Sequence, residues 1–326
     1  MPPLVMALMS ILIGVTGCVG YVYFSNLVLD RVIFPASGQT CARNIGRANL
    51  VRPWLFLFPA LAGSMLYLVF PFAGAFWRSL FDREGDAFIG FANYRALGAD
   101  HVFQGALANS LLWVLVVPAA ATCLGLIAAR LTDRLRWANL ARAAIFMPVT
   151  MSLVGAALIW KFVYANDADI GLLNAIRATL GAAGPLDVLQ IPVWNSFFLM
   201  AVLIWTQTGF AMVILSAALR AIPREIIEAA IMDGADATQI FLRIEVPQIK
   251  GTITVVWTLV TILVLKVFDL VYAMTGGNFG TQVLPGFMMG VMFRDDGRAS
   301  AVAMVLMILV LPILAWNIGQ ARKGGD

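Results

Sequence analysis

The chain has 326 residues, of which 61% are hydrophobic and only 12% are charged. A water-soluble domain carries about 25% charged and about 45–50% apolar residues, because its surface must stay hydrated. The composition therefore excludes a soluble globular enzyme and indicates a protein with several membrane spans. The net charge of +4 comes from dispersed basic residues, so it does not indicate nucleic-acid binding. Three cysteines without paired spacing predict neither a disulfide framework nor a metal site.

Seven uncharged stretches are candidate membrane spans, because about 20 mostly apolar residues cross a bilayer as a helix. They are residues 1–29, 54–77, 102–129, 143–160, 188–219, 251–265 and 299–321. The sixth stretch is short, so we expect its helix to continue through Lys266 and to bring Asp269 into or near the membrane. An eighth uncharged stretch, 270–293, is rich in glycine, and we expect a loop with a half-helix there.

The basic residues predict the orientation of the chain, because Lys and Arg close to span ends are retained on the cytoplasmic side. If the N-terminus lies outside, 14 of the 22 basic residues fall in inner segments: Arg31, Arg43, Arg47, Arg52, Arg130, Arg134, Arg136, Arg142, Arg220, Arg224, Arg243, Lys250, Arg322 and Lys323. The opposite orientation reverses this bias. We therefore expect the N-terminus outside and the C-terminus in the cytoplasm.

One inner segment, residues 220–250, is longer than the others and has the pattern of two short helices. Pro223 suits the first position of a helix, Gly234 supplies a turn, and Pro247 is expected to end the second helix. The segment contains five acidic and four basic residues. This balance disfavours a helix that lies on anionic lipid and favours one that docks on a soluble partner. We call residues 220–250 the coupling loop.

The coupling loop resembles the EAA signature of permease subunits of binding-protein-dependent ABC importers. The residues that carry the resemblance, at fixed spacing, are Glu228, Ala229, Ala230, Asp233, Gly234, Ala235, Phe241, Ile244 and Pro247. The resemblance extends over roughly residues 109–318 and includes Asn109-Ser110, which open the third span. Runs at 54–59, 205–210 and 266–269 are similar to the maltose and alpha-glucoside branch, which has a MetI-like transmembrane domain.

The resemblance implies an all-α membrane protein with about seven transmembrane helices. Residues 1–53 would form an extra N-terminal transmembrane helix and a cytoplasmic loop, and residues 54–105 would form a second transmembrane helix and an outer loop. Residues 106–320 would form the permease core, which completes a six-helix unit and contains the coupling loop.

The resemblance also implies the partners. Two permease subunits would form a pore in the bacterial inner membrane, a cytoplasmic ATPase dimer would drive it, and a periplasmic or extracellular sugar-binding protein would deliver an alpha-glucoside or oligosaccharide. The chain would not itself be an enzyme and would need no cofactor. It has no Gly-x-x-x-x-Gly-Lys-Ser/Thr run that could bind the phosphates of ATP, so the energy must come from a partner.

Within the coupling loop, the resemblance assigns a role to each candidate site residue. Glu228 would accept a charge-assisted hydrogen bond from a basic residue of the ATPase, with Asp233 available beside it. Ala229 and Ala230 would allow close packing and Gly234 would allow the turn, whereas ordinary helix packing is the alternative for these three. Pro247 would be structural in either case.

Polar and aromatic residues within the spans indicate a path for the solute, because polar groups inside a membrane tend to face a cavity or another helix. An amide beside aromatic faces suits the hydroxyls and the apolar C–H face of a sugar. The candidates are Trp205, Thr206, Gln207, Phe210 and Thr261. Positions of the sixth span that align with sugar contacts are apolar here, which favours a companion permease that holds most of the solute.

A secondary transporter is the alternative function. It would need ion-binding carboxylates near the middle of the membrane, for which Asp269 is the sole candidate in a span. Lys266 and Asp269 are three residues apart, and a structural ion pair on one helix face is favoured over a role in gating or solute binding.

Overall fold

The computed structural model describes residues 3–35, 41–133, 135–181 and 184–323. Among these residues every regular element is helical, apart from one isolated antiparallel bridge between Phe81 and Phe88. The predicted all-α fold is therefore confirmed. The chain divides into two compact units, Met1–Gly74 and Ala75–Asp326, and each is described by itself.

The first unit is built mainly from two long apolar helices. The Arg52 guanidinium binds the Asp30 carboxylate at 2.7 Å, and the Tyr21 hydroxyl donates to the Leu55 carbonyl at 2.9 Å. Most of the apolar side chains along both helices are exposed, as expected where the surroundings are lipid. The elements are α1 (Pro3–Val28), the π-helical turn η1 (Leu29–Ile33), α2 (Cys41–Ser64) and the π-helical turn η3 (Met65–Val69), and the chain continues into α3 (Phe70–Arg78).

The second unit is organised around α5 (His101–Thr132) and α9 (Trp194–Arg220), which pack along each other, with α13 (Lys250–Leu265) against both. A Cβ atom at Gly125 of α5 would lie 2.5 Å from the Cβ of Ala211 in α9, so glycine is needed for this close approach. The other elements are α4 (Ala92–Ala99), α6 (Ala138–Phe146), η4 (Met147–Thr150), α7 (Leu153–Val163), α8 (Leu172–Thr179), α10 (Arg224–Met232), α11 (Ala237–Ile240), η5 (Phe241–Glu245), α12 (Val246–Gln248), α14 (Asp269–Thr275), α15 (Leu284–Met292) and α16 (Asp296–Lys323).

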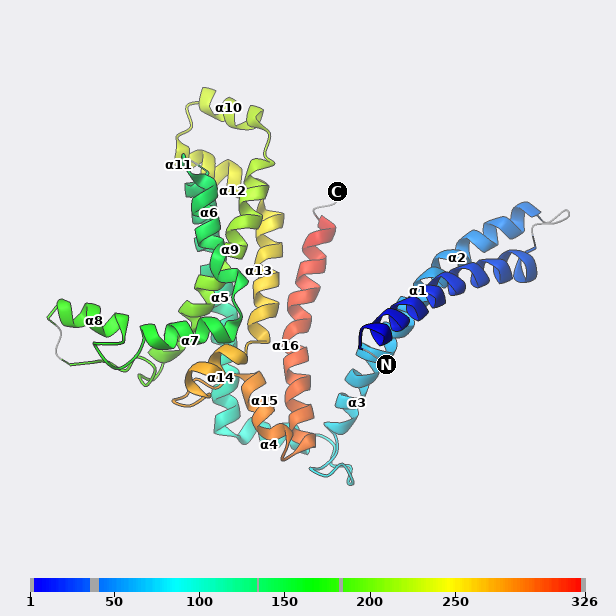
Figure 1. Cartoon of the computed structure of the whole chain (residues 1–326), viewed down its shortest axis with the longest axis horizontal. Coiled ribbons are helices and arrows are strands. Elements are labelled where there is room, and N and C mark those ends of the chain that lie inside the picture. The colour runs from blue at the N-terminus through cyan, green and yellow to red at the C-terminus, as the bar shows by residue number, and fades with distance from the viewer. Residues whose placement is uncertain (1–2, 36–40, 134, 182–183, 324–326) are drawn as a thin grey trace. The chain divides into compact units, whose positions relative to one another are not determined.

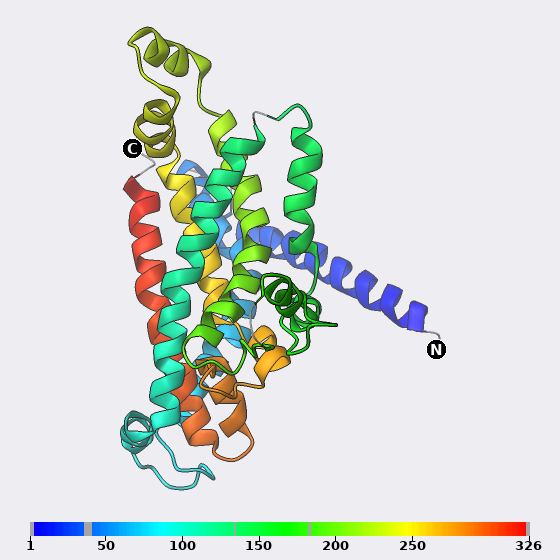
Figure 2. The same cartoon turned by 90° about the vertical axis from the view of Figure 1, so that its left-hand side faces the viewer.

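The second unit has two distinct ends. In both views α10 lies at one end, with the last turns of α16 directed towards it, whereas α4, α14 and α15 lie at the other (Figures 1 and 2). At that other end Asn109 donates to the carbonyls of Gly280 and Gln282, at 2.6 and 2.9 Å, and the Ser110 hydroxyl accepts from the Leu284 amide at 2.9 Å. The Asn109-Ser110 run therefore fixes the connection between α14 and α15 to the start of α5.

Four helices are long and apolar enough to cross a membrane: Val5–Ile33, Arg43–Arg78, His101–Thr132 and Trp194–Arg220. Two bent pairs raise the number to six if each is one span, namely Ala138–Thr150 with Leu153–Val163, bent by 103°, and Ala237–Gln248 with Lys250–Leu265, bent by 70°. These counts refer to the described residues. The predicted segment 299–321 lies within α16, and the total of seven spans stays a prediction.

The candidate span over residues 143–160 is not one straight helix, because the helix breaks near Met151. Pro148 has no amide hydrogen to donate, and Met151 is extended, with ψ of 148°. The Ser152 hydroxyl then accepts from the Gly155 amide at 3.1 Å and caps a new helix, α7.

The prediction that the sixth span continues through Lys266 to Asp269 is wrong. Helix α13 ends at Leu265, and the break at Phe268, with φ of −134°, separates it from α14. Lys266 and Asp269 are both exposed, and the part of the chain that the structure describes contains no ion pair between them. The following segment holds two short helices, α14 and α15, in agreement with the expected loop and half-helix.

Candidate functional site

The first half of the coupling loop is helix α10, and its end is fixed by backbone hydrogen bonds. The Gly234 amide donates to the Ile231 carbonyl and the Ala235 amide to the Ala230 carbonyl, both at 3.0 Å. This pair of bonds is the Schellman arrangement, which needs a left-handed residue just after the helix. Gly234 has φ of 80°, so it forms the turn that the sequence predicts.

The second half of the loop begins with a capping box. The Asp236 carboxylate accepts from the amides of Thr238 and Gln239 at 2.8 Å, and the Gln239 side chain accepts from the Asp236 amide at 3.1 Å. The helical chain then runs through η5 and α12 as far as Gln248. The predicted end at Pro247 is therefore wrong by one residue, and the 70° bend into α13 follows directly after Gln248.

Helix α10 presents acidic and apolar side chains outward. Glu228, Ala229 and Asp233 are exposed, whereas Ala230 is buried. Ile231 is 57% exposed and Met232 is 86% exposed. An exposed acid beside two exposed apolar side chains is suited to contact with another protein.

A cluster of charged side chains lies where the coupling loop meets α5, and sequence reasoning missed it. The Arg130 guanidinium binds the Glu245 carboxylate at 3.1 Å. Asp133, which caps α5, binds Arg142 of α6 and the Nε atom of Arg220 at 3.2 Å. Apart from Arg142, these side chains line a pocket of about 520 Å³ together with Glu228. The sequence signal that could have indicated this cluster is Glu245, an acidic residue between the apolar residues Ile244 and Val246.

Three of the five predicted solute-path residues line one cavity of about 400 Å³. Thr206, Gln207 and Phe210 of α9 face it, and the remaining lining residues come from α13 and from the break before α7: Val149, Met151, Leu153, Leu259 and Leu263. We call this space the α9 cavity. The cavity lies beside the helix break near Met151. A membrane protein tolerates non-helical backbone where it lines a cavity.

The α9 cavity contains an amide with free hydrogen-bonding capacity. The Thr206 hydroxyl donates to the Leu203 carbonyl at 2.9 Å, and the Gln207 amide nitrogen makes a contact of 3.5 Å with that hydroxyl. Among the described residues this is the only hydrogen bond of the Gln207 side chain, which is 8% exposed. A hydroxylated solute could therefore bind here without displacing a strong internal contact.

The other two predicted solute-path residues lie elsewhere. Trp205 packs edge-on against Trp160, with ring centroids 5.6 Å apart, and lines a separate apolar pocket. Thr261 is buried, and its hydroxyl donates to the Trp257 carbonyl at 2.7 Å. The grouping of all five residues in one path is not what the structure shows, because successive residues of a helix point in different directions.

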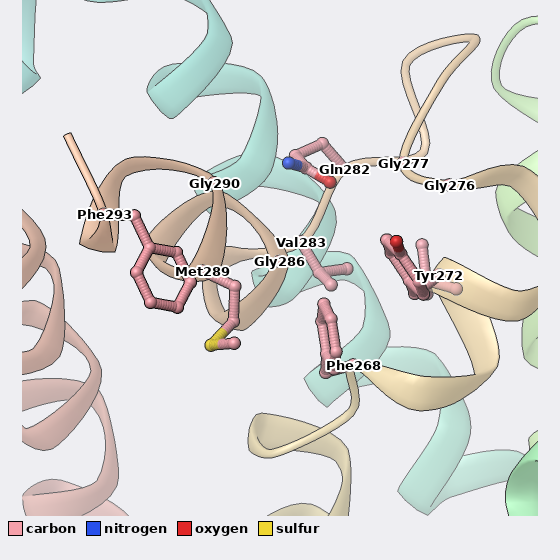
Figure 3. Close-up of a pocket in the computed structure, with 11 residues that line it drawn as sticks. Phe268, Tyr272, Gly276, Gly277, Gln282, Val283, Gly286, Met289, Gly290 and Phe293 are labelled. Atoms are coloured by element: carbon pink, nitrogen blue, oxygen red, sulfur yellow. The ribbon is translucent and has the colours of Figure 1, made fainter.

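A further cleft of about 350 Å³ lies between α14 and α15 (Figure 3). Phe268 and Tyr272 are stacked along one wall, with ring centroids 5.2 Å apart, and Met289 and Phe293 are at the opposite side. The Gln282 side chain lies where a Cβ atom at Gly277 would collide with it. The sequence predicted a glycine-rich loop with a half-helix here, but not the cleft.

Residues 121–319 match the family described as binding-protein-dependent transport system inner membrane component. The chain is 53% identical over 333 residues to an alpha-glucoside transport system permease protein of Rhizobium meliloti, with 99% of this chain and 98% of that protein covered. It is 45% identical to an osmoprotective compounds uptake permease protein of Synechocystis, over 82% of this chain and 98% of that protein. A chain of a bacterial alginate ABC transporter, solved in complex with an alginate pentasaccharide-bound periplasmic protein, has a similar fold, with a TM-score of 0.73 at 20% identity over 87% of this chain and 98% of that chain.

Proposed function

The chain belongs to the family of binding-protein-dependent transport system inner membrane components, and from this premise we propose that it is the permease subunit of an ATP-driven importer of alpha-glucosides. The observation that carries the solute class is the 53% identity to an alpha-glucoside permease over 99% of the chain. The α9 cavity supports it, since Gln207 and Phe210 there combine an amide with an aromatic face.

We propose three kinds of partner for this subunit. A second permease completes the pore, a cytoplasmic ATPase dimer supplies the energy, and an outer sugar-binding protein delivers the solute. The family description supports the binding protein, and so does the periplasmic protein in the similar alginate transporter. A separate ATPase is supported by the absence from the sequence of a run that could hold the phosphates of ATP.

We propose that α10 is the helix that docks on the ATPase, with Glu228 as its main polar contact. Glu228 is exposed, and Ile231 and Met232 offer apolar surface near it. A hydrogen bond from a basic side chain to this carboxylate would contribute about 1.5–3 kcal/mol. Gly234 and the buried Ala230 act on the same contact indirectly, because they fix the end of α10.

The orientation that follows places α10 in the cytoplasm and the N-terminus outside. It is supported by the 14 of 22 basic residues that this topology places in inner segments. The last turns of α16 are directed towards the α10 end (Figures 1 and 2), which agrees with a cytoplasmic C-terminus.

The docking role of Glu228 is tested by Glu228→Lys in the assembled transporter. We expect the ATPase to bind less tightly by at least roughly tenfold, because an attractive contact becomes a repulsive one. Binding of the purified ATPase to the membrane subunits in detergent measures this change. Glu225→Lys is the matched control, since Glu225 is exposed on the same helix but lies outside the signature. Equal losses for the two variants would show that only the net charge of α10 matters, and the role of Glu228 would then be refuted.

A further inference from the structure

The second half of the coupling loop is held to α5 by one arginine. Arg130 lies two residues before the end of α5, and its guanidinium makes two contacts with η5. It binds the Glu245 carboxylate at 3.1 Å and lies 5.8 Å from the centre of the Phe241 ring. The first distance is that of an ion pair and the second that of a cation–π contact, so Arg130 binds two side chains of η5.

The first half of the coupling loop is held to the same end of α5. Asp133 binds Arg220, the last residue of α9 and the first of the loop, at 3.2 Å. Asp133 also binds Arg142 of α6. The first half of the loop is therefore bonded to the C-cap residue of α5, Asp133, and the second half to Arg130 in its last turn, while α10 between them remains exposed.

The burial of the Arg130–Glu245 pair shows what it can contribute. The Glu245 side chain is 7% exposed and that of Arg130 is 26% exposed. The second carboxylate oxygen of Glu245 is buried and has no hydrogen-bond partner among the described residues. A buried ion pair with one oxygen unpaired adds little to stability, because desolvation of the charges offsets their attraction. Such pairs are best attested as devices that fix the register of two elements.

The other end of α5 is tied to the opposite end of the unit. Asn109 and Ser110 hold the connection between α14 and α15, as described above. One helix of 32 residues therefore has direct bonds both to the coupling loop and to the connection between α14 and α15, beside the cleft of Figure 3. A displacement of the loop that is bonded to α5 would move α5 with it.

We propose that Arg130 and Glu245 are positioning residues that fix the coupling loop to α5, so that movement of α10 on the ATPase is transmitted to the permease core. This proposal rests on the proposed function of α10. It assigns to Glu245 a task distinct from that of Glu228. Glu228 contacts the partner, whereas Glu245 connects the loop to the rest of its own chain.

The test uses the complete transporter in proteoliposomes, with an alpha-glucoside-loaded binding protein outside and ATP inside. Glu245→Gln keeps the size of the side chain and removes its charge. We expect the amount of assembled transporter to stay unchanged and the solute imported per ATP hydrolysed to fall by roughly fivefold or more, the lower end of typical coupling between sites. The double variant Arg130→Glu with Glu245→Arg restores the pair and should recover most of this ratio, whereas Arg130→Glu alone should not.

A matched control is Asp296→Asn, which removes an ion pair of the same 3.1 Å length, between Arg78 and Asp296, at the other end of the unit. This variant should keep the wild-type ratio. The proposal is overturned if Glu245→Gln keeps that ratio, if it loses transport only in proportion to assembled transporter, or if the charge exchange restores nothing. If the wild-type chain shows no ATP-dependent import, the proposed function itself fails, and that outcome is distinguishable from all of these.

Discussion

Gln207 is a polar side chain buried in α9, where its desolvation is unfavourable but where it can bind a solute. It is almost fully buried, and its amide has one weak contact, to Thr206 at 3.5 Å. An amide buried with so few partners is unfavourable unless another group binds it. Because the side chain borders the α9 cavity with Phe210, a sugar hydroxyl is the partner that the proposed function supplies.

We predict that Gln207→Ala raises the KM for uptake of an alpha-glucoside by about two- to thirteenfold, the effect of losing a neutral hydrogen bond of about 0.5–1.5 kcal/mol. Uptake kinetics in proteoliposomes measure the change, with assembly followed by size-exclusion chromatography. Thr208→Ala is the control, because Thr208 lies in the same helix but lines the separate apolar pocket that contains Trp205. If transport and assembly fall in parallel, Gln207 is structural and the role proposed for it is wrong.

The sequence predicted the residues whose roles are set by their neighbours in the chain. Gly234 is an example, since a helix whose C-cap residue is Asp233 ends in this way only with a left-handed residue directly after the cap. Glu245 is a counterexample, because its partner Arg130 lies far away in the chain and only the tertiary packing brings them together. Trp205 and Gln207 were grouped because they are two residues apart, but that spacing turns side chains to different sides of a helix.

At the scale of elements, the crossing of α5 and α9 depends on small side chains. Gly125 is buried against Ala211. At Gly209 of α9 an added Cβ atom would lie 2.4 Å from the carbonyl oxygen of Ile145, near the end of α6. In a membrane, association of helices relies on such close packing, because there is little hydrophobic driving force between them.

We predict that Gly125→Ala destabilises the protein by about 1–3 kcal/mol, since the added methyl group overpacks the crossing. Gly105→Ala, in the same helix, should be neutral or stabilising by up to about 1 kcal/mol, because nothing lies within 4 Å of an added Cβ there and alanine favours a helix. The midpoint of thermal unfolding in detergent compares the two variants. A Gly125→Ala protein as stable as Gly105→Ala would contradict the packing described for α5 and α9.

The sequence predicted the long helices well and their breaks poorly. Apolar runs marked α5 and α9 because composition decides whether a helix can lie in a membrane. The breaks near Met151 and Phe268 depend on the loss of a backbone donor, on a serine cap and on the packing around them. A count of apolar residues contains none of this information, so it predicted neither the break within 143–160 nor the end of α13 at Leu265.

At the scale of the whole molecule, the proposed docking helix and the cleft between α14 and α15 lie at opposite ends of the second unit. Helix α10 lies at one end, α4, α14 and α15 lie at the other, and α5 connects the two (Figure 1). The coupling loop has more acidic than basic residues, which disfavours contact with anionic lipid. Asp269, the candidate ion-binding carboxylate of a secondary transporter, is exposed and begins a short helix after a break. These features favour coupling to a soluble partner over coupling to an ion.

The central claim is that ATP, and not an ion gradient, drives import through this subunit. The direct measurement is uptake of a radiolabelled alpha-glucoside into right-side-out vesicles that contain the chain with its companion permease, the ATPase and an outer binding protein. We predict uptake against a gradient when ATP is enclosed, and none when only a proton or sodium gradient is imposed. Enclosed ATP is effective only if α10 faces the interior, so the same result supports the proposed orientation. Uptake driven by an ion gradient without ATP would contradict the account.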